Sequence, residues 1–157
     1  AEASGSLGSD FTQCVWTLET LETTQQLGQH LARHLPKGSI LLLQGELGAG
    51  KTSLVQGLAQ ACGITEPITS PTFALAQHYP DGNPPLVHLD LYRLEGAGSA
   101  DELFLQEEEE ARAIGALMAV EWPERLGLEL TEAWRLDLSY LKTGRRAQLT
   151  PPKNAST

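Results

Sequence analysis

The sequence predicts an α/β fold in which a mostly parallel central sheet lies between two layers of helices. Short apolar runs at 40–43, 86–90 and 116–120 have the length and composition of strands that are buried on both faces. Stretches with helical periodicity separate these runs, as expected for parallel strands. An antiparallel hairpin at the C-terminal end, 134–140 with 147–150, is expected to turn at Gly144.

Length and charge limit what the chain can be. Its 157 residues, 41% of them hydrophobic, predict a single domain over 11–150, with a mobile tail at 1–10 and another tail at 151–157. The formal charge of −9 argues against a free-standing nucleic-acid binder, because phosphate contacts need clustered Lys and Arg. Any work on RNA is therefore expected to go through a partner.

The cysteines and the hydropathy pattern favour a cytoplasmic protein. Cys14 and Cys62 lack metal-ligand spacing and are expected to be buried free thiols in a reducing compartment. No apolar run approaches the roughly 20 residues that span a bilayer.

The first elements are a strand within 11–18 and a helix that Thr20 can cap. Pro36 ends this helix, whose apolar face is expected to carry Leu21, Leu27, Leu31 and Leu35. Thr24 lies beside that face. Propensity alone favours a surface threonine, although its hydroxyl is placed where a base or ribose could be met.

The stretch 45–52 reads Gly-Glu-Leu-Gly-Ala-Gly-Lys-Thr and fits the phosphate-loop pattern GxxxxGK[ST] at every position. It joins the strand at 40–43 to a helix whose apolar residues are Leu54, Val55, Leu58 and Cys62, closed by Gly63. Backbone N–H groups and the helix dipole can hold a polyphosphate there. The fold class is thus that of a P-loop NTPase-like three-layer sandwich.

Two side chains of this loop have expected roles. Lys51 can reach the β- and γ-phosphates, and we expect its side chain to be exposed at an empty loop. The Thr52 hydroxyl can ligate Mg²⁺.

The polar stretch 69–73 precedes a predicted strand at 73–79. Ser70 and Thr72 offer hydroxyls to a switch that senses the γ-phosphate, while an ordinary turn fixed by Pro71 explains the composition equally well.

Two of the predicted strands end in an acid, Asp90 and Glu121. Parallel strands bring both carboxylates to the sheet edge where open α/β sheets bind ligands, and Asp90 is the first candidate to hold Mg²⁺ through water or to orient the attacking water. His88 is expected to be packed rather than catalytic. Arg93 could neutralise phosphate, but pairing with an acid on the surface is commoner.

A helix is expected to begin at a capping box, 99–102, and to direct Leu103, Phe104 and Leu105 into the core. The four glutamates from Glu107 to Glu110 point around a helix, which favours a solvated face over a metal or partner site.

Four motifs together resemble the TsaE (YjeE) family, the bacterial ATPase component of tRNA threonylcarbamoyladenosine synthesis: the phosphate loop, 70–73 (SPTF), 88–94 (HLDLYRL) and 121–125 (EWPER). The resemblance covers roughly 17–140. The acidic stretch 106–114 and the C-terminal hairpin depart from the family pattern.

The resemblance implies roles for individual residues. Glu121 joins Thr52 as a Mg²⁺ ligand, Asp90 takes the Walker-B-like role and Thr72 lies in a switch-like loop. The implied nucleotide contacts are Thr24, Gly48, Ala49, Gly50, Lys51, Thr52 and Ser53.

The expected function is therefore a Mg²⁺-dependent ATPase that serves tRNA modification with a TsaB–TsaD complex. A small P-loop kinase is the alternative, and a nucleotide-sensing module without meaningful turnover is a third. The chain has no arginine-rich insertion after Gly96 that could close over a second phosphate, which argues against the kinase.

Overall fold

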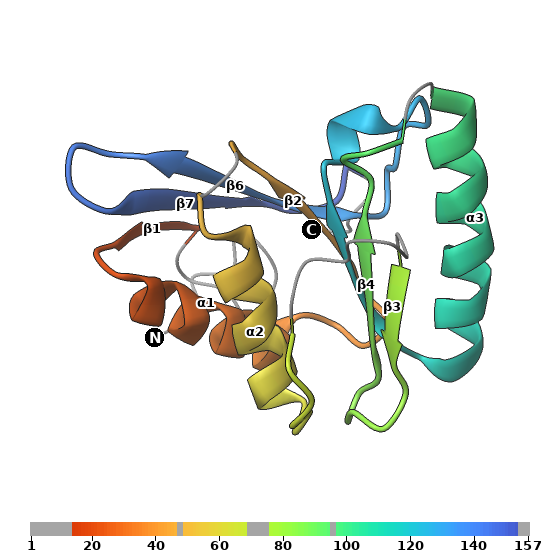
Figure 1. Cartoon of the computed structure of the whole chain (residues 1–157), viewed down its shortest axis with the longest axis horizontal. Coiled ribbons are helices and arrows are strands. Elements are labelled where there is room, and N and C mark those ends of the chain that lie inside the picture. The colour runs from red at the N-terminus through yellow and green to blue at the C-terminus, as the bar shows by residue number, and fades with distance from the viewer. Residues whose placement is uncertain (1–13, 47–48, 69–75, 95–96, 154–157) are drawn as a thin grey trace.

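The computed structural model describes residues 14–46, 49–68, 76–94 and 97–153, and its centre is one seven-stranded sheet (Figure 1). The strands are β1 (Val15–Leu18), β2 (Ile40–Gln44), β3 (Ala76–Tyr79), β4 (Leu86–Asp90), β5 (Leu117–Glu121), β6 (Trp134–Tyr140) and β7 (Arg145–Thr150). Their order is β1-β7-β6-β2-β5-β4-β3. The four central strands β6, β2, β5 and β4 are parallel, whereas β1, β7 and β3 pair antiparallel with their neighbours. The predicted parallel sheet with a C-terminal hairpin is confirmed.

Helices cover both faces of this sheet. The helices α1 (Leu21–His34) and α2 (Lys51–Ala61) lie on one face, and α3 (Ala97–Ile114) lies on the other (Figure 1). The alternation of β2 shows the division: Leu41 and Leu43 belong to the core under α1 and α2, while Ile40 and Leu42 belong to the core under α3. A central strand with two buried faces has to be apolar throughout, which explains its sequence.

Two glycines bring the backbones of α1 and α2 into contact. A Cβ atom at Gly28 would lie 2.2 Å from the carbonyl oxygen of Leu54, and one at Gly57 would lie 2.0 Å from that of Gln25. Neither position admits any larger residue without moving a helix. Hydrogen bonds between glutamine side chains flank the contact, from Gln25 to Gln56 at 2.8 Å and from Gln29 to Gln60 at 2.6 Å.

The first helix begins as the sequence predicts. Thr20 is the N-cap and forms a reciprocal capping box with Thr23. The helix ends at His34, before Pro36. The expectation for Leu21 is wrong, because this side chain is 48% exposed. Leu21 lies six positions before Leu27. Six residues turn about 240° around a helix, so the two side chains lie on different sides of it.

The third helix corrects two expectations. It begins at Ala97, so Ser99 is not its cap. The carboxylate of Asp101 instead accepts hydrogen bonds from the backbone of Gly127 and Leu128. Leu105 is 50% exposed although Phe104 is fully buried, because successive residues are about 100° apart around a helix.

The glutamate run is not uniformly solvated. Glu107 is only 6% exposed, whereas Glu109 and Glu110 are exposed and Glu108 is half-buried and bonded to Arg112. The prediction of a solvated face is therefore wrong for Glu107.

Both cysteines are free thiols, Cys62 buried and Cys14 half-buried, and burial raises the pKa of the Cys62 thiol. None of the described helices is long and apolar enough to cross a membrane.

Candidate phosphate site at the carboxyl end of the sheet

The phosphate loop leaves the carboxyl end of β2, the middle strand of the sheet, and enters α2. Gly50 is the N-cap of α2 and has φ +107°, a value that favours glycine. As a glycine it supplies no side-chain acceptor, so no side chain caps the first N–H groups of α2. These N–H groups form the positive end of the helix dipole, next to the loop. Ala49 and Gly50 are buried, whereas Gly48 lies outside the described residues. The predicted strand–loop–helix arrangement is confirmed.

Lys51 is not exposed, contrary to expectation. The residue is 5% exposed, its Nζ donates a hydrogen bond to the Gly45 carbonyl oxygen at 2.6 Å, and Nζ lies 3.9 Å from the centroid of the Trp122 ring. Desolvation lowers the pKa of the ammonium group, and the charges of Glu121, Glu124 and Asp90 oppose that shift. A cation–π contact with the indole ring and a hydrogen bond to a backbone carbonyl thus hold the ammonium group.

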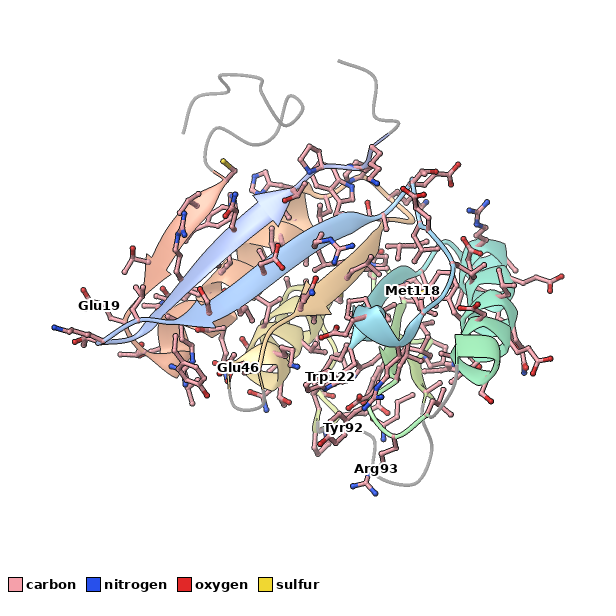
Figure 2. All side chains as sticks on the ribbon, turned by 90° about the horizontal axis from the view of Figure 1, so that it is seen from above. Glu19, Glu46, Tyr92, Arg93, Met118 and Trp122 are labelled. Carbon is pink, nitrogen blue, oxygen red and sulfur yellow. The ribbon has the colours of Figure 1, made fainter. Side chains whose placement is uncertain are left out.

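Trp122, whose ring lies beside Lys51, has a left-handed backbone conformation. With φ 60° and ψ 50° it is the single non-glycine residue with positive φ in the described chain. Such a conformation costs about 1–3 kcal/mol and persists where the surroundings impose it. The ring also packs on Tyr92, at 4.8 Å between centroids, and Arg125 lies over Tyr92 at 5.7 Å. Figure 2 shows Glu46, Trp122 and Tyr92 along one edge of the molecule.

The two predicted acids end neighbouring strands. Asp90 of β4 and Glu121 of β5 are register partners in a parallel pair, so they lie at the same edge as the phosphate loop. Asp90 is half-buried and its Oδ1 accepts a hydrogen bond from the Tyr92 N–H at 3.0 Å. Burial raises the pKa of Asp90; the bond from Tyr92 opposes this shift, and the charge of Glu121 adds to it.

His88 is packed, as expected, but it also contacts a predicted site residue. It is fully buried, and its Nε2 lies 2.7 Å from Oε2 of Glu121, which is 3% exposed. The N–H donates to the carboxylate and fixes one of its two oxygens. The other ring nitrogen, Nδ1, has no hydrogen-bond partner among the described residues. The alternation of β4 places His88 on the face of Asp90, but the sequence alone did not identify its partner.

Residues from two distant elements complete the surroundings of the loop. Thr24 of α1 is fully buried, so the surface-threonine prediction is wrong, and its Cγ2 lies 3.5 Å from the place where a Gly50 Cβ would be. The side chain of Arg145, the first residue of β7, approaches that place to 3.4 Å and lies over the Tyr140 ring. No motif in the sequence marks Arg145.

The other predicted site residues differ in how the structure places them. Thr52 and Ser53 lie in the first turn of α2. Arg93 is exposed and has no ion pair within the described ranges, so the expected pairing with an acid is not found there. Ser70 and Thr72 lie outside the described residues.

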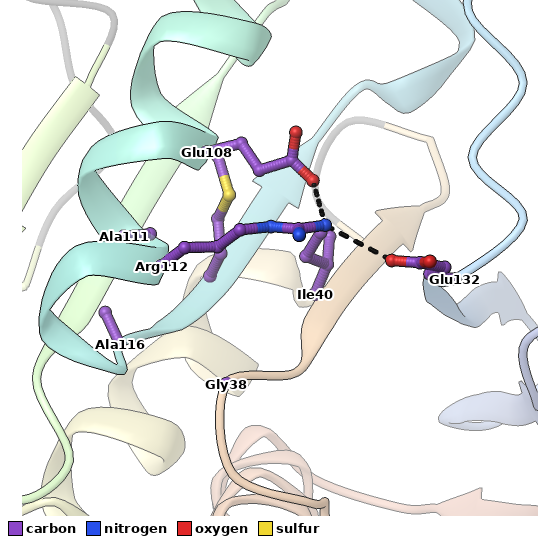
Figure 3. Close-up of a pocket in the computed structure, with 8 residues that line it drawn as sticks. Gly38, Ile40, Glu108, Ala111, Arg112, Ala116 and Glu132 are labelled. Atoms are coloured by element: carbon purple, nitrogen blue, oxygen red, sulfur yellow. Dashed lines mark hydrogen bonds and ion pairs between the residues drawn. The ribbon is translucent and has the colours of Figure 1, made fainter.

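A separate pocket of about 220 Å³ lies near the amino end of β2, lined by Gly38 and Ile40 (Figure 3). Arg112 extends across it and bonds to Glu108 and Glu132. Because the phosphate loop leaves the opposite end of β2, this pocket is not part of the candidate site.

Comparisons with known proteins show what this chain is similar to. The family model "Threonylcarbamoyl adenosine biosynthesis protein TsaE" matches residues 18–148. A TsaE protein of Synechocystis is 54% identical over 112 residues, 69% of each chain. One of Nostoc is 46% identical over 134 residues, 83% of this chain and 81% of its own. The crystal structure of Bacillus subtilis YdiB superposes with a TM-score of 0.67 and 30% identity, and the match covers 89% of this chain and 86% of that one.

Proposed function

The chain belongs to the TsaE family, and from this premise we propose that it is an ATP-binding, Mg²⁺-dependent ATPase required for threonylcarbamoyladenosine modification of tRNA, acting with a TsaB–TsaD complex. One observation carries the ATPase assignment: the strand-end carboxylates of Asp90 and Glu121 lie side by side at the edge where the phosphate loop leaves β2. A tRNA-modifying role and two free thiols favour a cytoplasmic location.

The nucleotide phosphates would lie along the loop and the first turn of α2, from Gly48 to Ser53. Lys51 is held by the Gly45 carbonyl oxygen and the Trp122 ring. When nucleotide binds, its ammonium group would exchange these partners for β- and γ-phosphate oxygens. Thr24 and Arg145 approach the loop from outside. The methyl group of Thr24 faces Gly50 and its hydroxyl donates to the Thr20 carbonyl oxygen at 3.3 Å, so this hydroxyl could still accept a hydrogen bond from the nucleotide, and the Arg145 guanidinium could contact the rest of it.

The donor set fits Mg²⁺, which prefers hard oxygen ligands. The Thr52 hydroxyl and the Glu121 carboxylate would hold the ion. His88 bonds to Oε2 of Glu121, which leaves Oε1 as the oxygen that would bind the metal. When bound, Mg²⁺ neutralises charge on the β- and γ-phosphates.

Asp90 is suited to orient the attacking water. Its Oδ1 accepts the Tyr92 N–H, which leaves Oδ2 to accept a hydrogen bond from water. Burial raises the pKa of this carboxyl group and so strengthens it as a proton acceptor. We assign Thr72 to sensing the γ-phosphate, in line with its motif.

Phosphate release measured for the chain alone and with the TsaB–TsaD pair tests this function. We expect slow turnover alone and a changed rate with the partners. Radiolabelled γ-phosphate should appear as inorganic phosphate. Label transferred to a protein or a small molecule would favour the kinase, and nucleotide binding with no release under either condition would favour a sensing module.

A further inference from the structure

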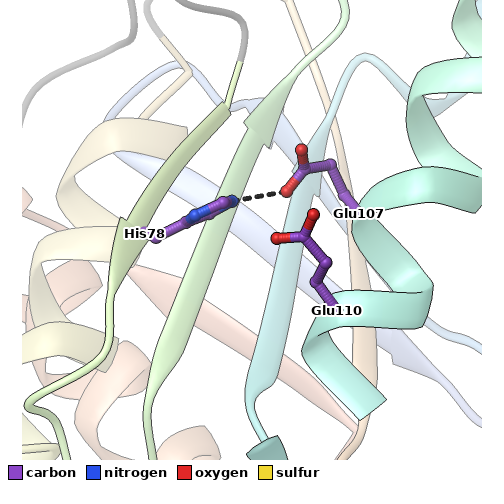
Figure 4. A group of neighbouring side chains, drawn as sticks. All are labelled: His78, Glu107 and Glu110. Carbon is purple, nitrogen blue, oxygen red and sulfur yellow. Dashed lines mark hydrogen bonds and ion pairs between the residues drawn. The ribbon is translucent and has the colours of Figure 1, made fainter. Parts of the chain in front are cut away.

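A second group of metal-ligating side chains lies between the edge strand β3 and the helix α3. His78 comes from β3, and Glu107 and Glu110 come from α3 (Figure 4). One ligand atom from each lies within 4.8 Å of the others. The side chains point toward one another, as Figure 4 shows.

His78 is the basic side chain that faces these carboxylates in the described part of the chain. Glu107 is 6% exposed, and its Oε1 lies 2.5 Å from Nε2 of His78. Glu110, one turn further along α3, brings a second carboxylate to the same place. Neither glutamate forms an ion pair with a lysine or arginine in the part of the chain that the structure describes. Burying a carboxylate beside another is costly unless a positive charge accompanies them.

We propose that His78, Glu107 and Glu110 bind a divalent transition-metal ion, with Zn²⁺ the best fit. One imidazole nitrogen and two carboxylate oxygens form a set that zinc accepts in tetrahedral geometry, with water in the fourth position. A set that includes a nitrogen ligand is a poor match for Mg²⁺, which prefers oxygen ligands alone.

The geometry requires one adjustment. Ligands about 2.1 Å from a tetrahedral ion lie about 3.4 Å apart, so Nε2 of His78 and Oε1 of Glu107 must separate by roughly 1 Å. The His78 side chain is 43% exposed and has room to rotate. Glu107 is held in place by the helix, and the exposed Glu110 can close on the ion.

This site is distinct from the phosphate site. His78 pairs with Val87, three residues before Asp90 on β4, which corresponds to about 10 Å along a strand. A metal here would join the edge strand β3 to α3. It would protect a sheet edge and fix the strand that follows the stretch containing Thr72.

Zinc titration of metal-stripped protein without nucleotide, followed by calorimetry, tests the proposal. We expect one Zn²⁺ per chain and a raised melting temperature. His78→Ala and Glu110→Gln should each weaken binding by about 100-fold or more, beyond the loss of about 10- to 100-fold that follows removal of an outer-shell partner. Glu110 is exposed, so Glu110→Gln should fold. His78 is also exposed, but His78→Ala removes the hydrogen-bond partner of the buried Glu107, so circular dichroism should first show that this variant is folded.

Three control variants make the result specific. Glu109→Gln changes an exposed glutamate of the same helix and should bind zinc like the wild type. His30 and His34 of α1 have ring centroids 4.4 Å apart and could chelate zinc by themselves. His34→Gln removes one of the two and should bind zinc like the wild type. Thr52→Ala removes a ligand of the proposed Mg²⁺ site and should leave zinc binding unchanged. Unaltered affinity in His78→Ala and Glu110→Gln, loss in His34→Gln alone, or no stoichiometric binding by the wild type would overturn the proposal.

Discussion

Replacing His88 by leucine tests whether this residue positions Glu121. The substitution keeps a side chain of similar size in a fully buried place and removes the N–H that donates to Oε2 of Glu121. We expect a less stable protein whose nucleotide binding has lost most of its dependence on Mg²⁺. Binding without Mg²⁺ should remain, because His88 is not placed among the proposed phosphate contacts.

The size of the effect follows from burial. Glu121 is 3% exposed, and removing one partner of a buried pair costs about 3–5 kcal/mol. Leucine also removes Nδ1 of His88, a buried atom without a hydrogen-bond partner in the described ranges, which offsets about 1 kcal/mol. The net loss of about 2–4 kcal/mol corresponds to about 4–16 °C in Tm for a domain of this size. Loss of an outer-shell partner weakens metal affinity by about 10- to 100-fold.

Urea unfolding gives the stability change, and titration of a fluorescent ATP analogue with and without Mg²⁺ gives the binding change. His88→Gln is the matched control, because its amide can still donate to Glu121. The double variant His88→Leu/Glu121→Leu should recover stability, since no buried carboxylate remains. A loss below about 1 kcal/mol in His88→Leu, or equal weakening of binding with and without Mg²⁺, would refute the positioning role.

Three further expectations concern the phosphate site and its partners. Lys51→Ala should remain folded and lose productive ATP binding and hydrolysis, and wild-type phosphate release in this variant would contradict the loop assignment. Asp90→Asn should retain nucleotide binding and lose turnover. Burial raises the pKa of Asp90, so the ionised carboxylate destabilises the fold and the asparagine variant should be more stable at neutral pH. This gain should disappear as the pH falls below the carboxyl range. Urea unfolding of both proteins at pH 7 and pH 3 gives the difference in the free energy of unfolding that tests this. Labelled tRNA at near-physiological salt should not bind the isolated chain with sub-micromolar affinity, given the formal charge of −9, and such binding would overturn the electrostatic argument.

Local sequence patterns were sufficient for the parallel strands at the centre of the sheet and for the position of the phosphate loop. The strand at 86–90 has its predicted bounds, and β2 is central as its unbroken apolar run requires. Asp90 and Glu121 meet because both end parallel strands, an inference that needs only the order of elements. In these cases, residues close in sequence determine the result.

The surroundings of the site depend on contacts between distant segments, and sequence patterns do not show them. Trp122 covers Lys51 from the end of another strand, through a left-handed backbone that propensity disfavours. Arg145 reaches the loop because of the register of the C-terminal hairpin. Glu107 is buried and bonded to His78, which β3 brings to it across the edge of the sheet.

The glycine contact between α1 and α2 has a consequence for motion. Packed helices slide past each other by small changes of side-chain rotamers, but at Gly28 and Gly57 the surfaces that meet are backbone, which has no rotamers to change. Sliding between the two helices would therefore require their backbones to separate, which ties Thr24 of α1 to the N-terminal end of α2. On the other side of the loop, Trp122 meets Lys51 and Tyr92 through side chains, which can change rotamer without moving a helix.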